Sequence, residues 1–246
     1  MYSTEINGEV VEFGTSGWLY QSNKLMYDRG TNTLWHQFLG KPVVGELVGS
    51  GIKLKVLPVT LTTWDDWVAA HPDTTVLHIE TGVYPAGSYL AEEHPASVYS
   101  SYRRSEDTMF PVPERSSRLP TKSRVLGLTL NGRSRAYPED VLTQEPVVND
   151  SLGGTELVVV TIGGGSRAYQ AGGHNFIIDG NPGSRSSTKF LLDENGESWE
   201  ITENALVGTG NPEQRLGRLP SSSSFWFGWY AFHPDTEVYQ PGQPSP

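Results

Sequence analysis

The chain has 246 residues and no cysteine, so it is long enough to bury a substantial core without disulfides or a structural metal. Its 28 acidic residues against 18 basic ones give a net charge of −10, which repels phosphate backbones and argues against a nucleic-acid partner. The 27 glycines and 17 prolines predict a turn-rich, mainly β fold with short helices.

Strand signals come first along the chain. The segments "EVVEF" (9–13), "VVGEL" (43–47) and "IKLKVLP" (52–58) are rich in β-branched or alternating apolar residues and are predicted as strands. "MYSTEINGEVVEF" lacks the basic and apolar stretches of a signal peptide, and no window reaches the roughly 18 apolar residues of a membrane helix. We therefore expect no membrane span.

A short helix is predicted within "WDDWVAAHPDT", residues 64–74, because its two tryptophans are three positions apart. Thr63 is a suitable N-cap, and the acidic residues that follow favour the first turn. His71 precedes a proline, which disfavours helical backbone, so the helix is expected to end there. The Asp-Thr pair then suits a turn.

The middle of the chain, residues 82–122, is rich in proline, serine and tyrosine and has no sustained period of 2 or 3.6. We interpret it as a connecting segment between a first lobe (1–81) and a second lobe (123–246). Its tyrosines are expected to lie on a folded surface, because they carry large apolar areas. They are Tyr84, Tyr89, Tyr99 and Tyr102.

The second lobe begins with the clearest local signal, "VLGLTLNGRSRAYP" (125–138). Its Asn131-Gly132 accepts positive φ at both positions and predicts a two-residue hairpin. "ELVVVT" (156–161) is a further strand, and "LLDENGESWEIT" (191–202) is expected to repeat the hairpin device. "WFGWYAFHPDT" then predicts a second short helix with Ser224 as its N-cap.

The two tryptophan phrases indicate an internal duplication. From Trp64 to Val76 and from Trp226 to Val238, eight of thirteen positions are identical at a constant offset of 162 residues. "LMYDRGTNTLW" and "FLLDENGESW" extend the likeness upstream. The sequence thus predicts two pseudo-repeated, β-rich lobes. Residues 125–161 have no counterpart in the first lobe, so we expect that lobe to have an unpaired strand edge and the chain to self-associate through it.

Several motifs together resemble the bacterial and archaeal family known as domain of unknown function 3179. They are "FGTSGWLYQSNKLMYDRGTNTLW", "VVGEL", "WDDWVAAHPDT", "AYPEDVL", "VVNDSLGG" and "FWFGWYAFHPDTEVY". The resemblance covers about Phe13 to Tyr239 and implies no assigned activity, although it favours an extracytoplasmic or extracellular location. Members typically have an upstream Cys-Pro-Leu-Cys-Gly-like segment, which this chain lacks. Any redox or metal role of those cysteines is therefore not expected here.

The repeated His-Pro-Asp-Thr sequence is the main catalytic candidate. Imidazole beside carboxylate can act as a general base, so His71, Asp73, His233 and Asp235 could form a hydrolase or metal-dependent site at the lobe interface. The same residues are also explained by a helix stop and a turn, and we favour that structural interpretation. No cofactor or metal is predicted, since no phosphate loop, nucleophile elbow or zinc helix is present.

A ligand-binding set is predicted where the two lobes differ. Arg29 corresponds to Glu194 in the second lobe, so an arginine role would exist in one lobe only. A duplicated scaffold tends to place function at such asymmetric positions, and Arg29, His36 and Gln37 are therefore the candidate ligand-facing residues.

The tryptophans support two interpretations, of which burial in the core is favoured. Six of them lie in the matching segments: Trp35, Trp64, Trp67, Trp199, Trp226 and Trp229. The leading hypothesis is a non-catalytic binding or assembly protein. The alternatives are the His/Asp enzyme and an aromatic carbohydrate-binding module, which requires at least two indoles exposed side by side.

Overall fold

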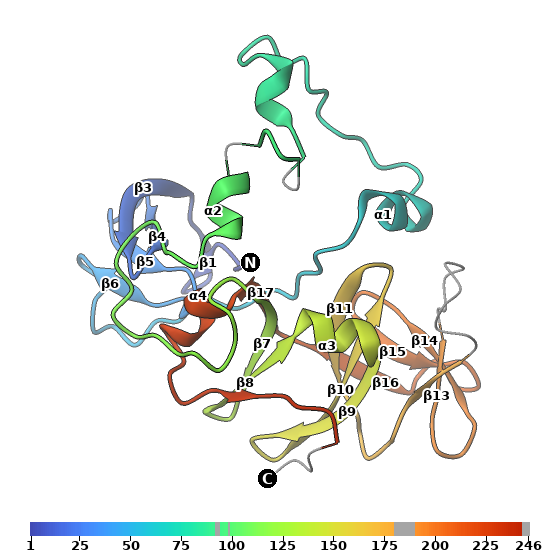
Figure 1. Ribbon diagram of the computed structural model, residues 1–246. Helices are drawn as coiled ribbons and strands as arrows, with labels where there is room; N and C mark the ends of the chain where they lie inside the picture. The colour runs from blue at the N-terminus through green and yellow to red at the C-terminus, as the bar shows by residue number, and fades with distance from the viewer. Residues whose placement is uncertain (92–93, 98, 180–189, 243–246) are drawn as a thin grey trace.

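The computed structural model describes residues 1–91, 94–97, 99–179 and 190–242, and the chain is mainly β-sheet with short helices, as predicted (Figure 1). The strands before the first helix are β1 (Glu5–Ile6), β2 (Glu9–Val10), β3 (Phe13–Tyr20), β4 (Asn23–Asp28), β5 (Leu34–His36) and β6 (Pro42–Val44). The helices are α1 (Trp64–Ala70), the 3-10 turn η1 (Ala86–Tyr89), α2 (Ser100–Arg104), α3 (Glu139–Gln144) and α4 (Trp226–Tyr230).

The strands of the C-terminal part follow α2. They are β7 (Arg124–Leu130), β8 (Arg133–Pro138), β9 (Val147–Leu152), β10 (Thr155–Ile162), β11 (Gly165–Gln170), β12 (Ile177–Ile178), β13 (Phe190–Leu192), β14 (Ser198–Ile201), β15 (Ala205–Gly208), β16 (Arg215–Leu219), β17 (Ser222–Phe225) and β18 (Glu237–Val238). Among the described residues, no helix combines the length and the apolar character needed to cross a membrane.

The N-terminal sheet has the strand order β3-β4-β5-β6, and all its pairings are antiparallel. Its core contains Ile6, Trp35 and Leu54. The strand predicted over 52–58 is wrong: the segment runs beside residues 1–3, with one isolated bridge from Val56 to Tyr2 and two flanking backbone hydrogen bonds, but forms no continuous ladder. Ile52 and Leu54 of this segment still pack in the N-terminal core, although their backbone is irregular.

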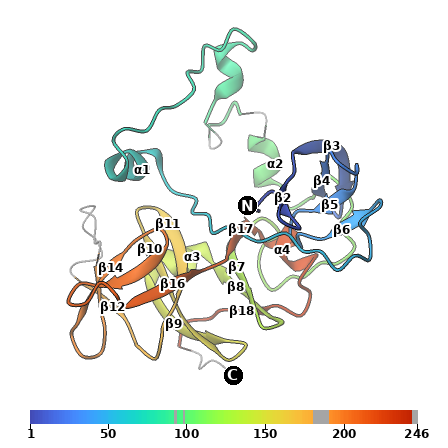
Figure 2. The same ribbon diagram turned by 180° about the vertical axis from the view of Figure 1, so that it is seen from behind.

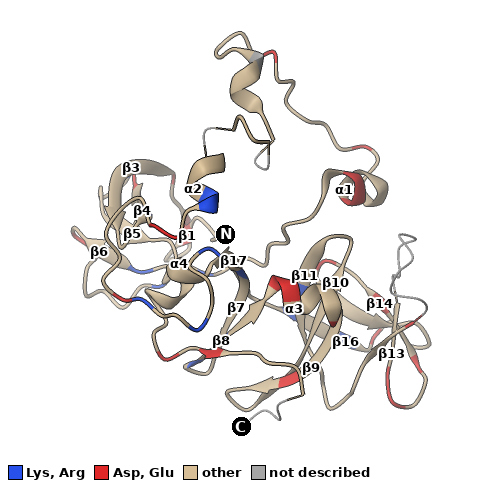
Figure 3. Cartoon of the chain, in the orientation of Figure 1, with Lys and Arg blue, Asp and Glu red and all other residues tan. Residues whose placement is uncertain are grey.

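Residues 59–91, which we call the arm, leave the N-terminal sheet and carry α1 and η1. In both views the arm runs outside the two β-sheet bodies (Figures 1 and 2). Figure 3 shows that it carries few charges beyond the acidic first turn of α1. The expectation that the tyrosines of 82–122 lie on a folded surface is wrong for Tyr84, Tyr89 and Tyr99, which are all exposed, whereas Tyr102 is half-buried.

Two sheets form the C-terminal part. The first has eight strands in the order β12-β13-β14-β15-β16-β11-β10-β9, and the second has the order β17-β7-β8-β18. All pairings are antiparallel except that of β18 with β8, which is parallel. The hairpin β7–β8 therefore lies between β17 on one edge and β18 on the other.

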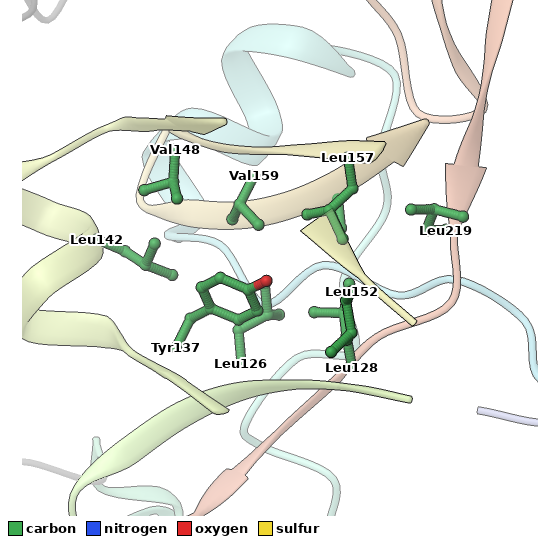
Figure 4. Close-up of a cluster of buried hydrophobic side chains, with 10 residues drawn as sticks. Leu126, Leu128, Tyr137, Leu142, Val148, Leu152, Leu157, Val159 and Leu219 are labelled. Atoms are coloured by element: carbon green, nitrogen blue, oxygen red, sulfur yellow. The ribbon is translucent and has the colours of Figure 1, made fainter. Parts of the chain in front are cut away.

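Strand β10 is buried on both faces, as its continuous apolar run suggests. Leu157 and Val159 point into the cluster around Tyr137 that Figure 4 shows between β7, β8, α3 and β9. Val158 and Val160 point the other way, into a second cluster. That cluster also contains Tyr169, Phe176, Leu191, Trp199 and Leu206. One strand thus joins the two cores of the C-terminal part.

The two predicted hairpins differ in their turns. Asn131 (φ 49°) and Gly132 (φ 81°) close a two-residue turn, with Leu130 opposite Arg133, as predicted. The turn at Asn195-Gly196 is longer than predicted, because Leu192 pairs with Ser198 and leaves five residues between them. The buried Asp193 carboxylate organises this loop by accepting backbone N–H groups of Asn195 and Glu197.

The start of α4 also differs from the prediction. Ser224 is not its N-cap, since this residue lies in β17 opposite Val125, and its hydroxyl has no hydrogen-bond partner among the described residues. The backbone N–H of Trp226 donates to the carbonyl of Ser123, and that of Phe227 to the carbonyl of Thr121. Carbonyls of the chain entering β7 thus take the place of a capping hydroxyl.

Candidate functional site

Helix α4 covers the face of the β17-β7-β8-β18 sheet with two buried indoles. Trp226 and Trp229 are 1% and 3% exposed and pack with Val125 and Ala136. The ring of Trp229 lies directly over Gly127 of β7, where an added Cβ would come within 2.4 Å of the indole. A glycine at this position is therefore what allows the helix to approach the sheet.

The turn after α4 is built on the same indole. The His233 ring stacks on Trp229 with a centroid distance of 4.0 Å and an interplanar angle of 27°. The indole Nε1 of Trp229 donates to Thr236 Oγ1 over 2.9 Å. Three residues of the second phrase thus form one local unit of tryptophan, histidine and threonine.

Helix α1 has the same unit. Thr63 Oγ1 accepts from the backbone N–H of Asp66, which confirms the predicted N-cap. The ring of His71 lies 4.1 Å from that of Trp67, and the Trp67 Nε1 donates to Thr74 Oγ1 over 3.0 Å. The local contacts of α1 are therefore those of α4.

The burial of the two units is opposite. Trp64 is 50% exposed and Trp67 is 38% exposed, so the prediction of core burial is wrong for these two and right for the other four matched tryptophans. Exposed apolar side chains continue along the arm on either side of α1: Val59, Leu61, Val76, Leu77 and Ile79. The arm thus presents the largest run of exposed apolar residues in the described chain.

The four His/Asp candidates are not brought together. His71 and Asp73 are exposed at the end of α1, whereas His233 is half-buried after α4 and Asp235 is exposed. Helices α1 and α4 lie apart in both views (Figures 1 and 2). Within the described residues, no group of three or more His, Cys, Asp or Glu side chains is arranged to hold a metal ion.

The three predicted ligand residues also lie apart. Arg29, which follows β4, is half-exposed and its Nε is 2.8 Å from Glu12 Oε1. His36 is at the other end of the β4–β5 pair, opposite Leu25, and is fully buried. Gln37 is exposed, and its carbonyl accepts from Tyr2 Oη over 2.5 Å. The structure gives these residues no common pocket among its described parts.

A small polar cavity of about 230 Å³ lies at the outer end of β9 and β10. It is lined by Asn149, Asp150, Ser151, Glu156, Leu157, Ala171, Gly173, His174 and Asn175. His174 Nδ1 is 3.2 Å from Glu194 Oε1 and 3.4 Å from Asp193 Oδ2. The His174 imidazole on the wall of this cavity is thus held by two carboxylates of the loop that follows β13.

The Asp150 carboxylate on the cavity wall belongs to a buried ion network. Arg135, with a 6% exposed side chain, pairs with both Asp150 and Glu237. The Tyr137 hydroxyl donates to Asp150 Oδ2 over 2.6 Å. Burial would lower the Arg135 pKa, but these carboxylates outweigh it and raise the pKa. The network joins β8, β9 and β18 and leaves Asp150 engaged with the protein itself.

Comparison with known proteins identifies the family. Residues 1–236 match the family described as "Protein of unknown function (DUF3179)". The chain belongs to this family. No curated protein matches the chain, and no solved structure matches it. The family resemblance drawn from the six sequence motifs is therefore confirmed, and membership in DUF3179 brings no assigned activity with it.

For this DUF3179 chain, sequence reasoning missed the exposure of α1 and the position of His174. Trp67 and Trp229 each stack on a histidine and bond a threonine, but the residues before them differ, with Asp65-Asp66 in α1 and Phe227-Gly228 in α4. His174 is brought to Glu194 by the pairing of β12 with β13, which no spacing in the sequence reveals. In this DUF3179 member, the acidic pair and the lack of a first-lobe counterpart to residues 125–161 were the signals of the exposure of α1.

Proposed function

We propose that this protein is a non-catalytic binding or assembly protein that engages a protein partner through the arm. The observation that carries the proposal is the exposure of Trp64 and Trp67, on a helix whose matched counterpart is buried. Large indoles contribute most when they are removed from water. Burying two half-exposed indoles would contribute about 5 kcal/mol at roughly 25 cal/mol per Å².

We also propose that the chain arose by internal duplication. The identity of the two tryptophan phrases supports this, and so does a second shared contact. Trp35 Nε1 donates to the buried Asp28 over 2.8 Å, and Trp199 Nε1 donates to the buried Asp193 over 3.1 Å. Under this proposal α1 is a copy of α4, and its exposure reflects a missing contact surface.

Self-association is the form of assembly that is tested first. Sedimentation velocity from low to high micromolar concentration shows whether the chain associates, and loss of any such association in Trp67→Ser would assign it to the arm. Trp18→Ser is the matched control, because Trp18 is 68% exposed on β3, away from the arm. A chain that stays monomeric throughout would remove self-assembly and restrict the proposal to binding a different protein.

A carbohydrate-binding platform is the second candidate, because Trp64 and Trp67 are both exposed on one short helix. Sugar sites combine such rings with several polar side chains that hold hydroxyl groups. The neighbours of these indoles include Leu61, Val76 and Leu77, which favours a protein surface instead. Calorimetric titration with soluble oligosaccharides separates the two, since only the platform would release heat that Trp67→Ser abolishes.

A further inference from the structure

The arm contains segments that correspond in sequence to the three elements that enclose the β7–β8 hairpin in the C-terminal part. We call such a set of three elements a clamp. Around the β7–β8 hairpin, β17 pairs along one edge, α4 covers one face, and β18 pairs along the other edge. We propose that residues 59–63, α1 and residues 75–77 form an equivalent clamp for a β-hairpin carried by a partner polypeptide. This inference rests on the proposed binding function and names the chemistry of the partner.

The correspondence extends beyond the helix. The offset of 162 that aligns Trp64 with Trp226 also aligns residues 60–63 with β17 and residues 75–76 with β18. Ser222 to Phe225 of β17 pair with Gly127 to Arg124, and Glu237 and Val238 pair with Arg135 and Ala136. Each element that holds the hairpin in the C-terminal part therefore has a matched segment in the arm.

The matched segments of the arm are free to pair. Within the described part of the chain, residues 59–62 and 75–79 belong to no strand and make no backbone-to-backbone hydrogen bond. Their apolar side chains are uncovered, with Val76 at 71% exposure and Leu77 at 83%. Backbone that belongs to no strand, beside exposed apolar side chains, is a surface to which a strand can be added.

The root of this clamp, residues 59–63, is bonded to the C-terminal part. Thr62 Oγ1 donates to the carbonyl of Gly163 in the β10–β11 turn, and Arg218 Nη2 donates to Thr60 Oγ1 over 2.7 Å. Arg218 Nη2 also donates to the Val59 carbonyl over 3.4 Å, and the Leu61 carbonyl lies against Gly165, so one side of residues 59–61 faces the body and only the other side is open to a partner. The root of the clamp is thus ordered before any partner binds, which lowers the entropic cost of binding.

The contact between Trp229 and Gly127 indicates which residue the partner must have opposite Trp67. Because an added Cβ at Gly127 would lie 2.4 Å from the indole, the strand facing Trp67 needs a glycine at the equivalent position. Its neighbours should be apolar, as Val125 and Ala136 are around α4. The partner element is therefore an antiparallel hairpin with a glycine between apolar residues on the face toward α1.

A second copy of this chain is not the favoured occupant. Its own β7–β8 hairpin is already paired on both edges, by β17 and β18, and its Gly127 is covered by Trp229. Transferring that hairpin to the arm of another copy would break its pairing with β17 and β18 and uncover Trp229. The inference therefore commits to a hairpin from a different polypeptide, and self-occupancy is an outcome that the test detects.

The test uses the full chain and a cyclised peptide with the sequence of residues 124–138, closed by a disulfide between two added terminal cysteines. A matched peptide carries Gly127→Val. Hydrogen exchange should show protection of amides in 60–63 and 75–77 on adding the glycine peptide, and calorimetry should give its affinity. We expect Gly127→Val in the peptide or Trp67→Ala in the protein to weaken binding about tenfold or more. Trp18→Ala should leave it unchanged.

Three results would overturn the inference. They are no binding of the glycine peptide at about 1 mM, equal binding of the valine peptide, or protection of 60–63 without peptide that rises with protein concentration. The last result would identify a second copy as the occupant. If the peptide fails while Trp67 still governs association in the sedimentation experiment, the hairpin chemistry is wrong and the binding function stands. Failure of both removes both proposals.

Discussion

At the scale of single residues, two buried histidines define the behaviour of the protein in acid. His36 Nδ1 accepts the backbone N–H groups of Phe38 and Leu39, so its proton is on Nε2, which has no partner among the described residues. Burial and the nearby His233 lower the pKa of His36 to about 4. Burial and Lys53 likewise lower the pKa of His233 to about 4. Both rings are neutral at pH 7.

These pKa values predict a loss of stability in mild acid. In the unfolded chain each histidine binds a proton near pH 6.5, whereas in the folded protein it does so only near pH 4. Between these values acid therefore favours unfolding, and each histidine contributes a slope of at most about 1.4 kcal/mol per pH unit. Urea denaturation at several pH values measures this slope.

His36→Asn is the matched variant for this experiment, because an asparagine oxygen can still accept the two amides but does not titrate. The slope between pH 6.5 and 4 should fall by about the share of one histidine. An unchanged slope in the variant would show that His36 is protonated equally in both states, contrary to its burial.

Asp28 and Asp193, which accept hydrogen bonds from buried indoles, also make the folded protein less stable as the pH falls. Burial raises the pKa of Asp28, but hydrogen bonds from Trp35, Thr31 and Thr33 outweigh it and hold the pKa below its usual value. Asp193 is held low in the same way by Trp199 and the backbone of its loop. Their contribution is complete above the unfolded pKa and is lost as the pH falls further, so acid unfolding should continue below the histidine range.

At the scale of elements, α1 and α4 show how far local sequence determines structure. Both helices were predicted, because capping and spacing act within a few residues; α1 ends at His71 as predicted, whereas α4 ends at Tyr230, before the His-Pro step. Burial depends on what lies opposite, and β7 with its Gly127 is opposite α4 only. Within the phrases, the sign of this difference is the acidic pair Asp65-Asp66 in α1 where α4 has Phe227-Gly228.

A pair of alanine variants tests this contrast. Trp229→Ala should destabilise the protein by about 3 to 5 kcal/mol, because it removes a buried ring from a packed core. Trp67→Ala should change the stability of the isolated chain by less than about 0.5 kcal/mol, since α1 packs on no core. Urea denaturation of both variants measures the difference. Equal effects would mean that α1 is buried in solution.

Strand predictions succeeded where the side chains themselves select the conformation. Asn131-Gly132 determines its turn by its positive φ angles, and the apolar run of β10 requires burial on both faces. The segment 52–58 has an equally good alternation, but its pairing with residues 1–3 is limited to one bridge and two flanking backbone hydrogen bonds, so no strand forms. Arg29 and His36 were grouped by closeness in sequence, and the register of β4 with β5 separates them.

At the scale of the whole molecule, one aromatic contact connects the N-terminal sheet to the C-terminal part. Phe232, just after α4, lies 5.3 Å from Phe38 with an interplanar angle of 25° and 4.1 Å from the ring of His36. Tyr20 completes the cluster at 5.8 Å from Phe232. The junction between the two parts is thus mostly apolar and centred on a single ring.

Phe232→Ala should therefore uncouple the two parts. The wild-type chain is expected to unfold in one thermal transition, and the variant in two, with the N-terminal sheet melting first because its core is the smaller. Differential scanning calorimetry distinguishes these outcomes. Tyr239→Phe is a control that removes a distant hydrogen bond, from the Tyr239 hydroxyl to Glu145, without touching the junction. A single transition in Phe232→Ala would show that other contacts hold the parts together.

Because β10 is buried on both faces, its position beside the arm determines where a force on the arm is passed to the rest of the protein. The turn that ends β10 meets the base of the arm closely: an added Cβ at Gly164 would come within 2.8 Å of Thr63, and one at Gly165 within 2.5 Å of the Leu61 carbonyl. A force on the arm is therefore passed to the β10–β11 turn, and through that short turn to a strand that both cores of the C-terminal part enclose.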